Sequence, residues 1–346
     1  MKTIQETSAY LGDNRFSTPF YKLDIIRQAK MLLDNFGSSH LHKNKGVGNA
    51  TKKARIYVVM QFIDDLRGLG FKIKNLNNLE QRHVTAVVGK WKAAKLSPST
   101  IMNRLTHLRW LTTALGKRGF MKTPAEYGLE KEDIARTYVA TVDKSWFGKY
   151  FITEELIGRA TELDPWVGIK FEMMEAFGLR IAEAILARPR VSDNGNNLVV
   201  EDGTKGGKTR IVPIASPKQR EILERAKALS LKASRGALIS PERDDPEKER
   251  QRIYLVCRKL GLTKKELGVT PHGLRHGYAN DEFKELTGVD SPVRGGPELP
   301  NTPEIVDAKQ AISNALGHRR IQITAAYVGK TKMGRPLSRP DNNKAS

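Results

Sequence analysis

The sequence predicts a multidomain chain, with an all-α helical bundle towards the N-terminus and a mixed α/β domain after it. The chain has 346 residues, enough for two ordinary domains with buried cores, and its apolar content of 39% is that of a globular protein. Apolar residues between positions 20 and 122 recur at helical spacing. After position 151, two strand-like runs flank Gly206-Gly207, which indicates a β-hairpin set among helices.

The first three helices of the bundle follow from periodic apolar residues. An amphipathic segment begins at residue 20 with the sequence FYKLDIIRQAKMLLDNF. Thr51 is expected to cap the second helix, because a threonine hydroxyl can accept from the free N–H groups of a first turn. The buried face of that helix is expected to hold Ile56, Val59, Phe62, Ile63 and Leu66. A third helix is expected from Leu79 to Trp91.

The fourth helix is expected in LSPSTIMNRLTHLRWLTTALGKRGF, which opens with capping Ser and Thr residues. Its buried face is expected to hold Ile101, Leu105, Leu108 and Thr112, with Arg104, His107 and Arg109 nearer the surface. The bundle would then present basic outer faces. The candidates for DNA contacts on these faces are Lys52, Lys53, Arg55 and Arg104, and the alternative is an ordinary solvated surface.

Changes in composition divide the rest of the chain. Residues 123–150 lose the helical periodicity and carry scattered charges, so we expect a linker there. The expected segments are an N-terminal extension at 1–19, the helical domain at 20–122, the linker, the mixed domain at 151–330 and a basic tail at 331–346.

Within the mixed domain, WVGIKFEMMEAFGLRIAEAILA is helical, with a break expected at Gly178. The sequence NNLVVEDGTKGGKTRIVPIA holds the two strands of the hairpin. Further helices are expected at 217–234 and 246–260.

The charge of the chain points to a polyanionic partner. Lys and Arg number 59 against 38 Asp and Glu, a formal net charge of +21, and nucleic acid is the first candidate. No stretch approaches the ~20 apolar residues of a membrane-spanning helix, and the start of the chain lacks the apolar core of a secretory signal. The lone cysteine, Cys257, excludes an internal disulfide and thiolate-bound zinc. We therefore expect a cytoplasmic protein without a membrane partner.

Four short segments carry residues suited to phosphoryl transfer. They are GLRIAEA with Arg180 and Glu183, TKGGKTR with Lys205 and Lys208, HGLRH with His272, Arg275 and His276, and LGHRRIQITAAY with His318 and Tyr327. A phenol, with a reference pKa of about 10, needs a group that accepts its proton before it can attack a phosphodiester. Planar Arg side chains match the phosphate oxygens, and a Lys ammonium can protonate the departing oxygen. The set forms a metal-free phosphoryl-transfer site.

These segments, in this order, resemble the tyrosine site-specific recombinase family of the phage-integrase kind, across nearly the whole chain from residue 20 onward. Tyr327 falls nine residues after His318, as that family places its nucleophile. The resemblance implies a covalent 3′-phosphotyrosyl link to Tyr327 and a general-acid role for Lys205, although Lys208 stays open as the alternative. It also implies a phosphate pocket of Arg180, His272, Arg275 and His318, with Glu183 and His276 in supporting roles.

The resemblance further implies a SAM-like core-binding domain that clamps double-stranded DNA together with the catalytic domain. The expected partners are a homo-tetramer on paired sites and accessory DNA-bending or directionality proteins, at the nucleoid. No cofactor and no metal are expected. The stretch from Arg275 to His318 is longer than the family usually needs, and its residues near 286–305 are expected to form an inserted surface loop.

Three other functions remain open on the sequence. A type IB topoisomerase shares the chemistry without pairing of sites, and a non-catalytic DNA-binding regulator would have no need of Tyr327 or Lys205. A metal-dependent integrase or nuclease would need a cluster of carboxylates for Mg²⁺, and none can be assembled from the sequence. His272 and His276 lie four residues apart, as zinc-binding histidines do, but the glutamate of that motif is replaced by Gly273.

Overall fold

The structure, a computed structural model, describes residues 20–41, 46–147, 152–233, 235–318 and 320–330. The expected N-terminal extension and the basic tail lie outside the described residues. The chain divides into two compact units, Met1–Arg136 and Thr137–Ser346, each with its own hydrophobic core. Among the described residues, no helix is both long enough and apolar enough to cross a membrane.

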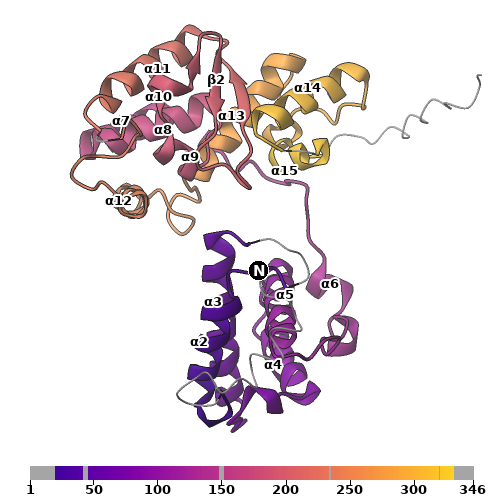
Figure 1. Ribbon diagram of the computed structural model, residues 1–346. Helices are drawn as coiled ribbons and strands as arrows, with labels where there is room; N and C mark the ends of the chain where they lie inside the picture. The colour runs from indigo at the N-terminus through magenta and orange to yellow at the C-terminus, as the bar shows by residue number, and fades with distance from the viewer. Residues whose placement is uncertain (1–19, 42–45, 148–151, 234, 319, 331–346) are drawn as a thin grey trace, which may run out of the picture. The chain divides into compact units, whose positions relative to one another are not determined.

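The first unit is all-helical (Figure 1). Its elements are η1 (Phe20–Lys22), α2 (Ile25–Phe36), α3 (Asn49–Gly68), η2 (Leu76–Asn78), α4 (Gln81–Ala93), α5 (Pro98–Ala114), η3 (Ala125–Tyr127) and α6 (Lys131–Ile134). The four long helices match the four that the periodicity predicts. Ser97 caps α5 by accepting from the N–H of Thr100, and the expected apolar face of α5 is buried.

Several expectations for the bundle are wrong. Thr51 lies inside α3, whose N-cap position is Gly48, and Ile56 is 48% exposed although it was expected in the core. Arg55 and His107 are buried although both were expected near the surface. The Nη1 atom of Arg55 donates to the carbonyl oxygens of Gly37 and Ser39 at 2.7 and 2.9 Å, so the side chain holds the turn after α2.

Arg104 also points into the bundle rather than away from it. Its guanidinium lies over the ring of Trp91, 5.0 Å from the centroid, and Nη1 is 3.9 Å from the carboxylate of Asp65. Asp65 is buried and accepts from Lys90 Nζ at 2.7 Å and from Trp91 Nε1 at 2.8 Å. Burial alone would raise the pKa of Asp65, but these two donors hold it below its ordinary value. The charge of Arg104 is therefore matched within the bundle.

The second unit is mostly helical with one small sheet (Figure 1). Its helices are α7 (Thr153–Leu163), α8 (Pro165–Phe177), α9 (Ile181–Leu186), α10 (Pro189–Ser192), α11 (Pro217–Ser230), α12 (Pro246–Lys259), α13 (His272–Thr287), η4 (Pro292–Arg294), α14 (Pro303–Ala315), η5 (Ile321–Thr324) and α15 (Ala325–Val328). Its strands are β1 (Asp193–Asn194), β2 (Asn197–Val200) and β3 (Arg210–Pro213). The predicted break at Gly178 is confirmed, because this residue ends α8 with φ 57° and ψ 33°.

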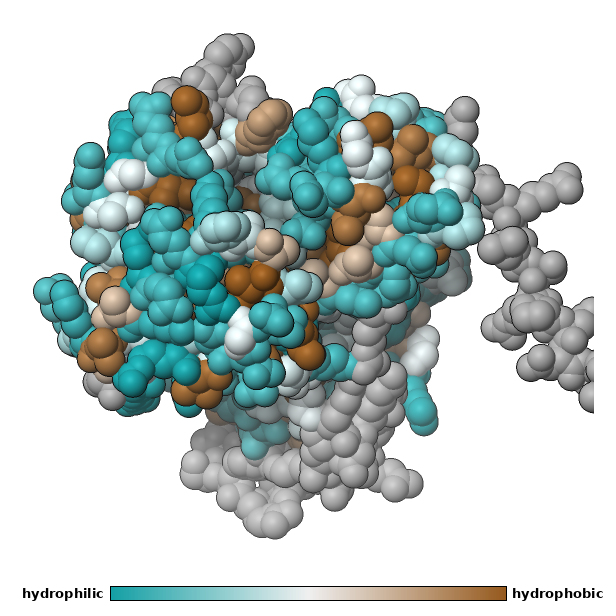
Figure 2. Space-filling model, turned by 90° about the horizontal axis from the view of Figure 1, so that it is seen from above, coloured by the Kyte–Doolittle hydropathy of each residue, from teal (hydrophilic) through white to brown (hydrophobic). Residues whose placement is uncertain are grey.

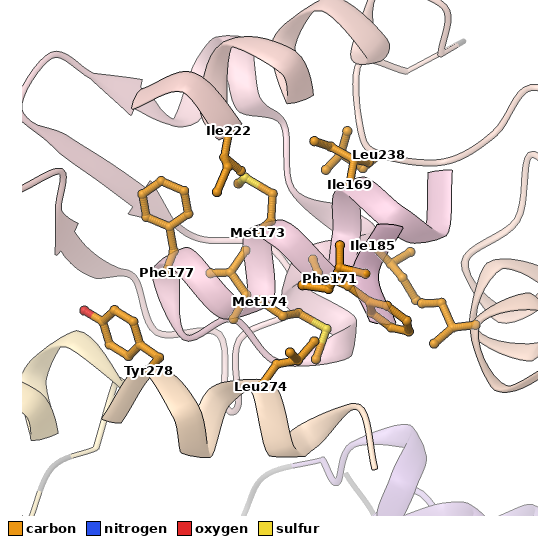
Figure 3. Packing of buried hydrophobic residues seen from close by; sticks show 14 of the residues in the cluster. Ile169, Phe171, Met173, Met174, Phe177, Ile185, Ile222, Leu238, Leu274 and Tyr278 are labelled. Carbon is orange, nitrogen blue, oxygen red and sulfur yellow. The ribbon is translucent and has the colours of Figure 1, made fainter. Parts of the chain in front are cut away.

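Helix α8 forms the centre of the second core. Figure 3 shows its residues Met173, Met174 and Phe177 among side chains of α11 and α13, including Ile222 and Tyr278. Asp164 caps α8 by accepting from the N–H groups of Trp166 and Val167. Burying this helix on several sides fixes its C-terminal end, from which the chain turns towards the candidate site.

The three strands form one antiparallel sheet in the order β1-β2-β3, with Leu198 opposite Val212. The predicted hairpin of β2 and β3 is confirmed, while the two-residue β1 was not predicted. The loop between β2 and β3 carries Lys205 and passes close to the carbonyl of Ala182 at Gly203. The sheet thus carries this loop to the start of α9.

The segment near 286–305, expected as an inserted surface loop, is anchored to the catalytic unit at Ser291 and Arg294. Ser291 is fully buried and donates to Asn280 Oδ1, and the side chain of Arg294 is 5% exposed. Arg294 Nε lies 3.1 Å from Asp143 Oδ2. Helix η4 packs against α15, so the inserted segment supports the helix that carries Tyr327. The outer surface of the described residues is mostly hydrophilic in the view of Figure 2.

Candidate active site

Arg180 stands where the chain leaves α8 and begins α9. The Glu183 carboxylate accepts from the Arg180 backbone N–H at 2.8 Å and forms an ion pair with its guanidinium. Nη2 of Arg180 also donates to the carbonyl of Leu316 at 3.3 Å. The Arg180 side chain remains 22% exposed, so a phosphate can still reach it.

Arg275, from α13, is the buried cation of the site, with no exposed surface. Its guanidinium donates to the carbonyls of Gly178 and Leu316, which joins the end of α8 to the end of α14. Its Nε lies 3.4 Å from the hydroxyl oxygen of Tyr327, and its Nη2 lies 3.4 Å from Nε2 of His318. Burial and the neighbouring charge of Arg180 lower the pKa of Arg275 to about 10, so it stays charged at neutral pH.

Tyr327 and His318 meet beside this cation. The Tyr327 hydroxyl oxygen lies 3.2 Å from His318 Nε2, and the tyrosine is 6% exposed. Arg275 has only donors, so His318 Nε2 must act as the acceptor in its contact with Arg275. The same lone pair then faces the Tyr327 hydroxyl, which is left as the donor. Burial and the charge of Arg275 lower the pKa of His318 to about 4, so the imidazole is neutral at pH 7 and able to take a proton.

The two other histidines lie near Tyr327. The His276 ring centroid is 4.6 Å from that of Tyr327, and the His272 centroid is 6.3 Å away. Burial and the charge of His272 lower the pKa of His276 to about 3. Protein atoms packed around its ring, and the charges of Arg275 and Arg180, lower the pKa of His272 to about 4, although His272 keeps contact with solvent. Both rings are therefore neutral at pH 7.

The hairpin lysines differ from the buried residues of the site in their exposure to solvent. Lys205 and Lys208 both lie in the exposed loop between β2 and β3. The charge of Lys205 is among those that lower the pKa of His318, after burial, Arg275, Arg180 and Arg210. The choice between Lys205 and Lys208 stays a prediction from the resemblance to the family.

One residue that sequence reasoning missed is Arg210, which is 5% exposed at the start of β3. The signal was present in the strand alternation. Arg210 and Val212 share one face, and Val212 belongs to the core, so the pattern puts Arg210 inside. Among the described residues, no group of three or more His, Cys, Asp or Glu side chains is placed to hold a metal ion.

The candidate DNA contacts of the first unit divide into two pairs. Lys52 is partly exposed and Lys53 exposed near the start of α3, where both were expected at the surface. Arg55 and Arg104 are engaged inside the bundle, so neither is available as an outward phosphate ligand in this structure.

Comparison with known proteins agrees with this fold and site. A model of the phage integrase N-terminal domain matches residues 34–120, and an integrase model matches residues 148–281. Tyrosine recombinase XerC of Mesorhizobium japonicum is 24% identical over 275 residues, covering 74% of this chain and 76% of that protein. The integrase match includes Arg180 and Arg275 but ends before His318 and Tyr327.

Two solved structures share the fold at low sequence identity. The XerH recombinase, bound to palindromic difH substrate after cleavage, has a TM-score of 0.54 and 13% identity, covering 95% of this chain and 90% of that one. Lambda integrase, as a tetramer bound to a Holliday junction, has a TM-score of 0.53 and 13% identity, covering 86% and 76%.

A helical N-terminal domain followed by a catalytic domain with a buried Arg, a histidine and a tyrosine in contact defines a phosphoryl-transfer protein of the integrase type. The chain belongs to the tyrosine site-specific recombinase family. The family and the two-domain architecture inferred from the sequence are both confirmed.

Proposed function

We propose that this chain cleaves and rejoins DNA at specific sites through a 3′-phosphotyrosyl link to Tyr327, and that it serves the integration or excision of a mobile element. The observation that carries the proposal is the position of the Tyr327 hydroxyl, 3.2 Å from His318 Nε2 and 3.4 Å from Arg275 Nε. A phenol placed between a neutral acceptor and a fixed cation is prepared to lose its proton and attack a phosphate.

The proposed cleavage step uses the side chains already described. Arg180, which is partly exposed, binds the non-bridging oxygens of the scissile phosphate, with His272 beside it. Arg275 has no exposed surface before DNA binds, so it joins them only after its guanidinium exchanges a backbone carbonyl for a phosphate oxygen. His318 accepts the phenol proton as the Tyr327 oxygen attacks phosphorus. The bond from phosphorus to the 5′-oxygen breaks, and Lys205 donates the proton that leaves a free 5′-hydroxyl.

Rejoining is the same step in reverse. The 5′-hydroxyl of a partner strand attacks the phosphotyrosine and passes its proton to Lys205. The bond from phosphorus to Tyr327 breaks, and His318 returns its proton to the phenol. Because the phosphodiester is exchanged for another ester and not hydrolysed, the proposed cycle needs no nucleotide cofactor and no metal.

The proposed partner is double-stranded DNA, contacted in part by Lys52 and Lys53. The lambda integrase relative, seen as a tetramer on a Holliday junction, supports a homo-tetramer of this chain on paired sites. Accessory DNA-bending or directionality proteins belong to the same proposal. A protein with this activity works on chromosomal or plasmid DNA, so we place it in the cytoplasm at the nucleoid.

The test is covalent trapping on nicked substrates made from short repeats found by sequencing the DNA beside the gene. A nick beside the cleavage site lets the short 5′-hydroxyl fragment leave, so the adduct accumulates and is seen on a denaturing gel. We expect an adduct with the native chain in the presence of EDTA and none with Tyr327→Phe. An adduct formed by the Phe variant, or activity that EDTA abolishes, would refute the proposal. Relaxation of supercoiled DNA that lacks these repeats would indicate topoisomerase activity instead.

A further inference from the structure

Arg210 is a second buried arginine at the site, and the proposed chemistry does not use it. No hydrogen bond or ion pair in the described residues joins it to Tyr327 or His318. Its guanidinium instead contacts two segments that are far away in the sequence, and its backbone belongs to a third, the strand that follows the lysine loop.

The first contact is with the turn and helix that carry Arg180. Arg210 Nη2 lies 2.9 Å from the Glu183 carboxylate and donates to the Gly178 carbonyl at 3.3 Å. Glu183 has no exposed surface, and it also pairs with the guanidinium of Arg180. Burial raises the pKa of Glu183, and the charge of Arg210 is the largest effect in the opposite direction, so the carboxylate stays ionised.

The second contact is with the turn that precedes His318. Arg210 Nη1 donates to the carbonyl of Ala315, the last residue of α14. The aliphatic part of Arg210 lies against Gly317, where a Cβ atom would stand 2.7 Å from Arg210 Cδ. Gly317 also has φ 66°, so this turn accepts only a residue without a side chain.

The third link is the chain itself. Arg210 is the first residue of β3, paired with Val200 at the last position of β2. These two residues close the base of the loop that carries Lys205. A side chain fixed at this base limits how far the loop can move away from Arg180 and His318.

We infer that Arg210 is a positioning residue, which fastens the base of the lysine hairpin to the Arg180 turn and the His318 turn and so keeps Lys205 over the departing 5′-oxygen. This inference rests on the proposed function. A lysine at this position would keep the charge, but it lacks the fork that reaches Glu183 and Ala315 together.

The test compares two leaving groups in single-turnover cleavage. On the normal substrate, we expect Arg210→Met to slow cleavage by about 10²-fold, the lower end of general-acid loss. On a substrate with a 5′-bridging sulfur, which leaves without a proton, we expect most of that rate to return. Arg210→Lys should fall between Arg210→Met and the native chain on the normal substrate.

Arg243→Met is the matched control. Arg243 is an arginine of the same unit whose side chain is 16% exposed and paired with Glu249 at 2.8 Å, but it contacts none of the catalytic segments. Its loss should lower thermal stability. It should not change the ratio between the cleavage rate on the 5′-bridging sulfur substrate and the cleavage rate on the normal substrate. If Arg210→Met and Arg210→Lys also leave this ratio unchanged, the positioning role is refuted. Failure of the native chain to form any adduct would instead refute the proposed function.

Discussion

The hydroxyl oxygen of Tyr327 and Nε2 of His318 lie 3.2 Å apart within one chain, and the two residues are only nine positions apart in the sequence. A proton acceptor is therefore in contact with the nucleophile before DNA is present. Helix α15 is held there by the backbone hydrogen bond from Ala140 to the Ala325 carbonyl and by η4. Under the proposed function, this arrangement places the Tyr327 phenol beside the Arg and His side chains of its own chain.

The assignment of the general acid is tested by the two hairpin lysines. Lys205→Ala should slow cleavage of the normal substrate by about 10²–10⁴-fold, the range for lost general acid–base catalysis. The 5′-bridging sulfur substrate should recover most of that rate. Lys208→Ala serves as the paired control and should show little loss on either substrate. A large loss with sulfur recovery in Lys208→Ala would transfer the role to that lysine.

The support of α15 by the inserted segment is tested at Gly329. This residue has φ 92°, and a Cβ atom there would stand 2.9 Å from Val293 Cγ1. With ψ −165°, Gly329 has a backbone conformation that essentially only glycine adopts, and it costs another residue about 1–3 kcal/mol. We expect Gly329→Ala to slow formation of the covalent adduct by about tenfold while DNA affinity, measured by gel shift, stays unchanged.

Gly288→Ala provides a control for a positive φ without a side-chain contact, since Gly288 lies in the left-handed α region (φ 75°, ψ 0°) and has open space around it. Gly288→Ala should lower stability without slowing cleavage. Equal rates for the two variants would mean that contact with Val293 does not matter to the nucleophile.

Lys52 and Lys53 are the bundle residues that we expect to contact DNA phosphates. Replacing both with alanine should flatten the dependence of log affinity on log salt by about one unit for each lost contact. Arg55→Ala should instead destabilise the bundle, because its guanidinium holds two backbone carbonyls. Affinity measured between low and physiological salt separates these effects, and an unchanged slope in the double lysine variant would show a merely solvated face.

The lowered pKa values of the three site histidines predict that the folded chain is less stable in acid. Burial lowers the pKa of His276 from 6.5 to about 3, and His272 and His318 are lowered to about 4. Between pH 6.5 and 4 the unfolded chain binds protons at these positions that the folded chain does not. The free energy of unfolding should therefore fall as the pH falls through this window.

Denaturant titrations at a series of pH values provide the measurement. His276→Asn removes one such group and should reduce the proton uptake on unfolding by about one. If the slope between pH 6.5 and 4 is the same in this variant as in the native chain, His276 does not contribute to the acid sensitivity.

Much of the fold follows from local patterns, while several features depend on partners far away in the sequence. Helix positions, the Gly178 break and the hairpin are encoded in short stretches that carry their own periodicity or turn residues. The burial of Arg55 depends on two carbonyls after α2, and that of Arg294 depends on Asp143, which lies 151 positions earlier. No periodic pattern in the sequence indicates such contacts. Arg55 and Arg294 therefore look like solvent-exposed residues until the fold is known.

The residues proposed for catalysis could be picked out of the sequence for a different reason. Arg180, Arg275, His318 and Tyr327 belong to short motifs in a fixed order, and the structure brings these four side chains together. Arg210 lies in one of the same motifs, yet its role depends on Glu183 and Ala315, which only the folded chain brings to it. The types of residue in the motifs indicate the reaction. Which residues hold the reacting groups in place becomes clear only from the contacts in the folded chain.

The guanidinium of Arg275 is held by carbonyls from two ends of the catalytic unit, at Gly178 and at Leu316. During translation, the second of these carbonyls and the reactive phenol are among the last described parts to leave the ribosome. The bundle, complete by Arg136, emerges well before them. Under the proposed function, a nascent chain therefore cannot break a strand, since the anchor of Arg275 at Leu316 and then the phenol of Tyr327 are made only at the end of the described chain.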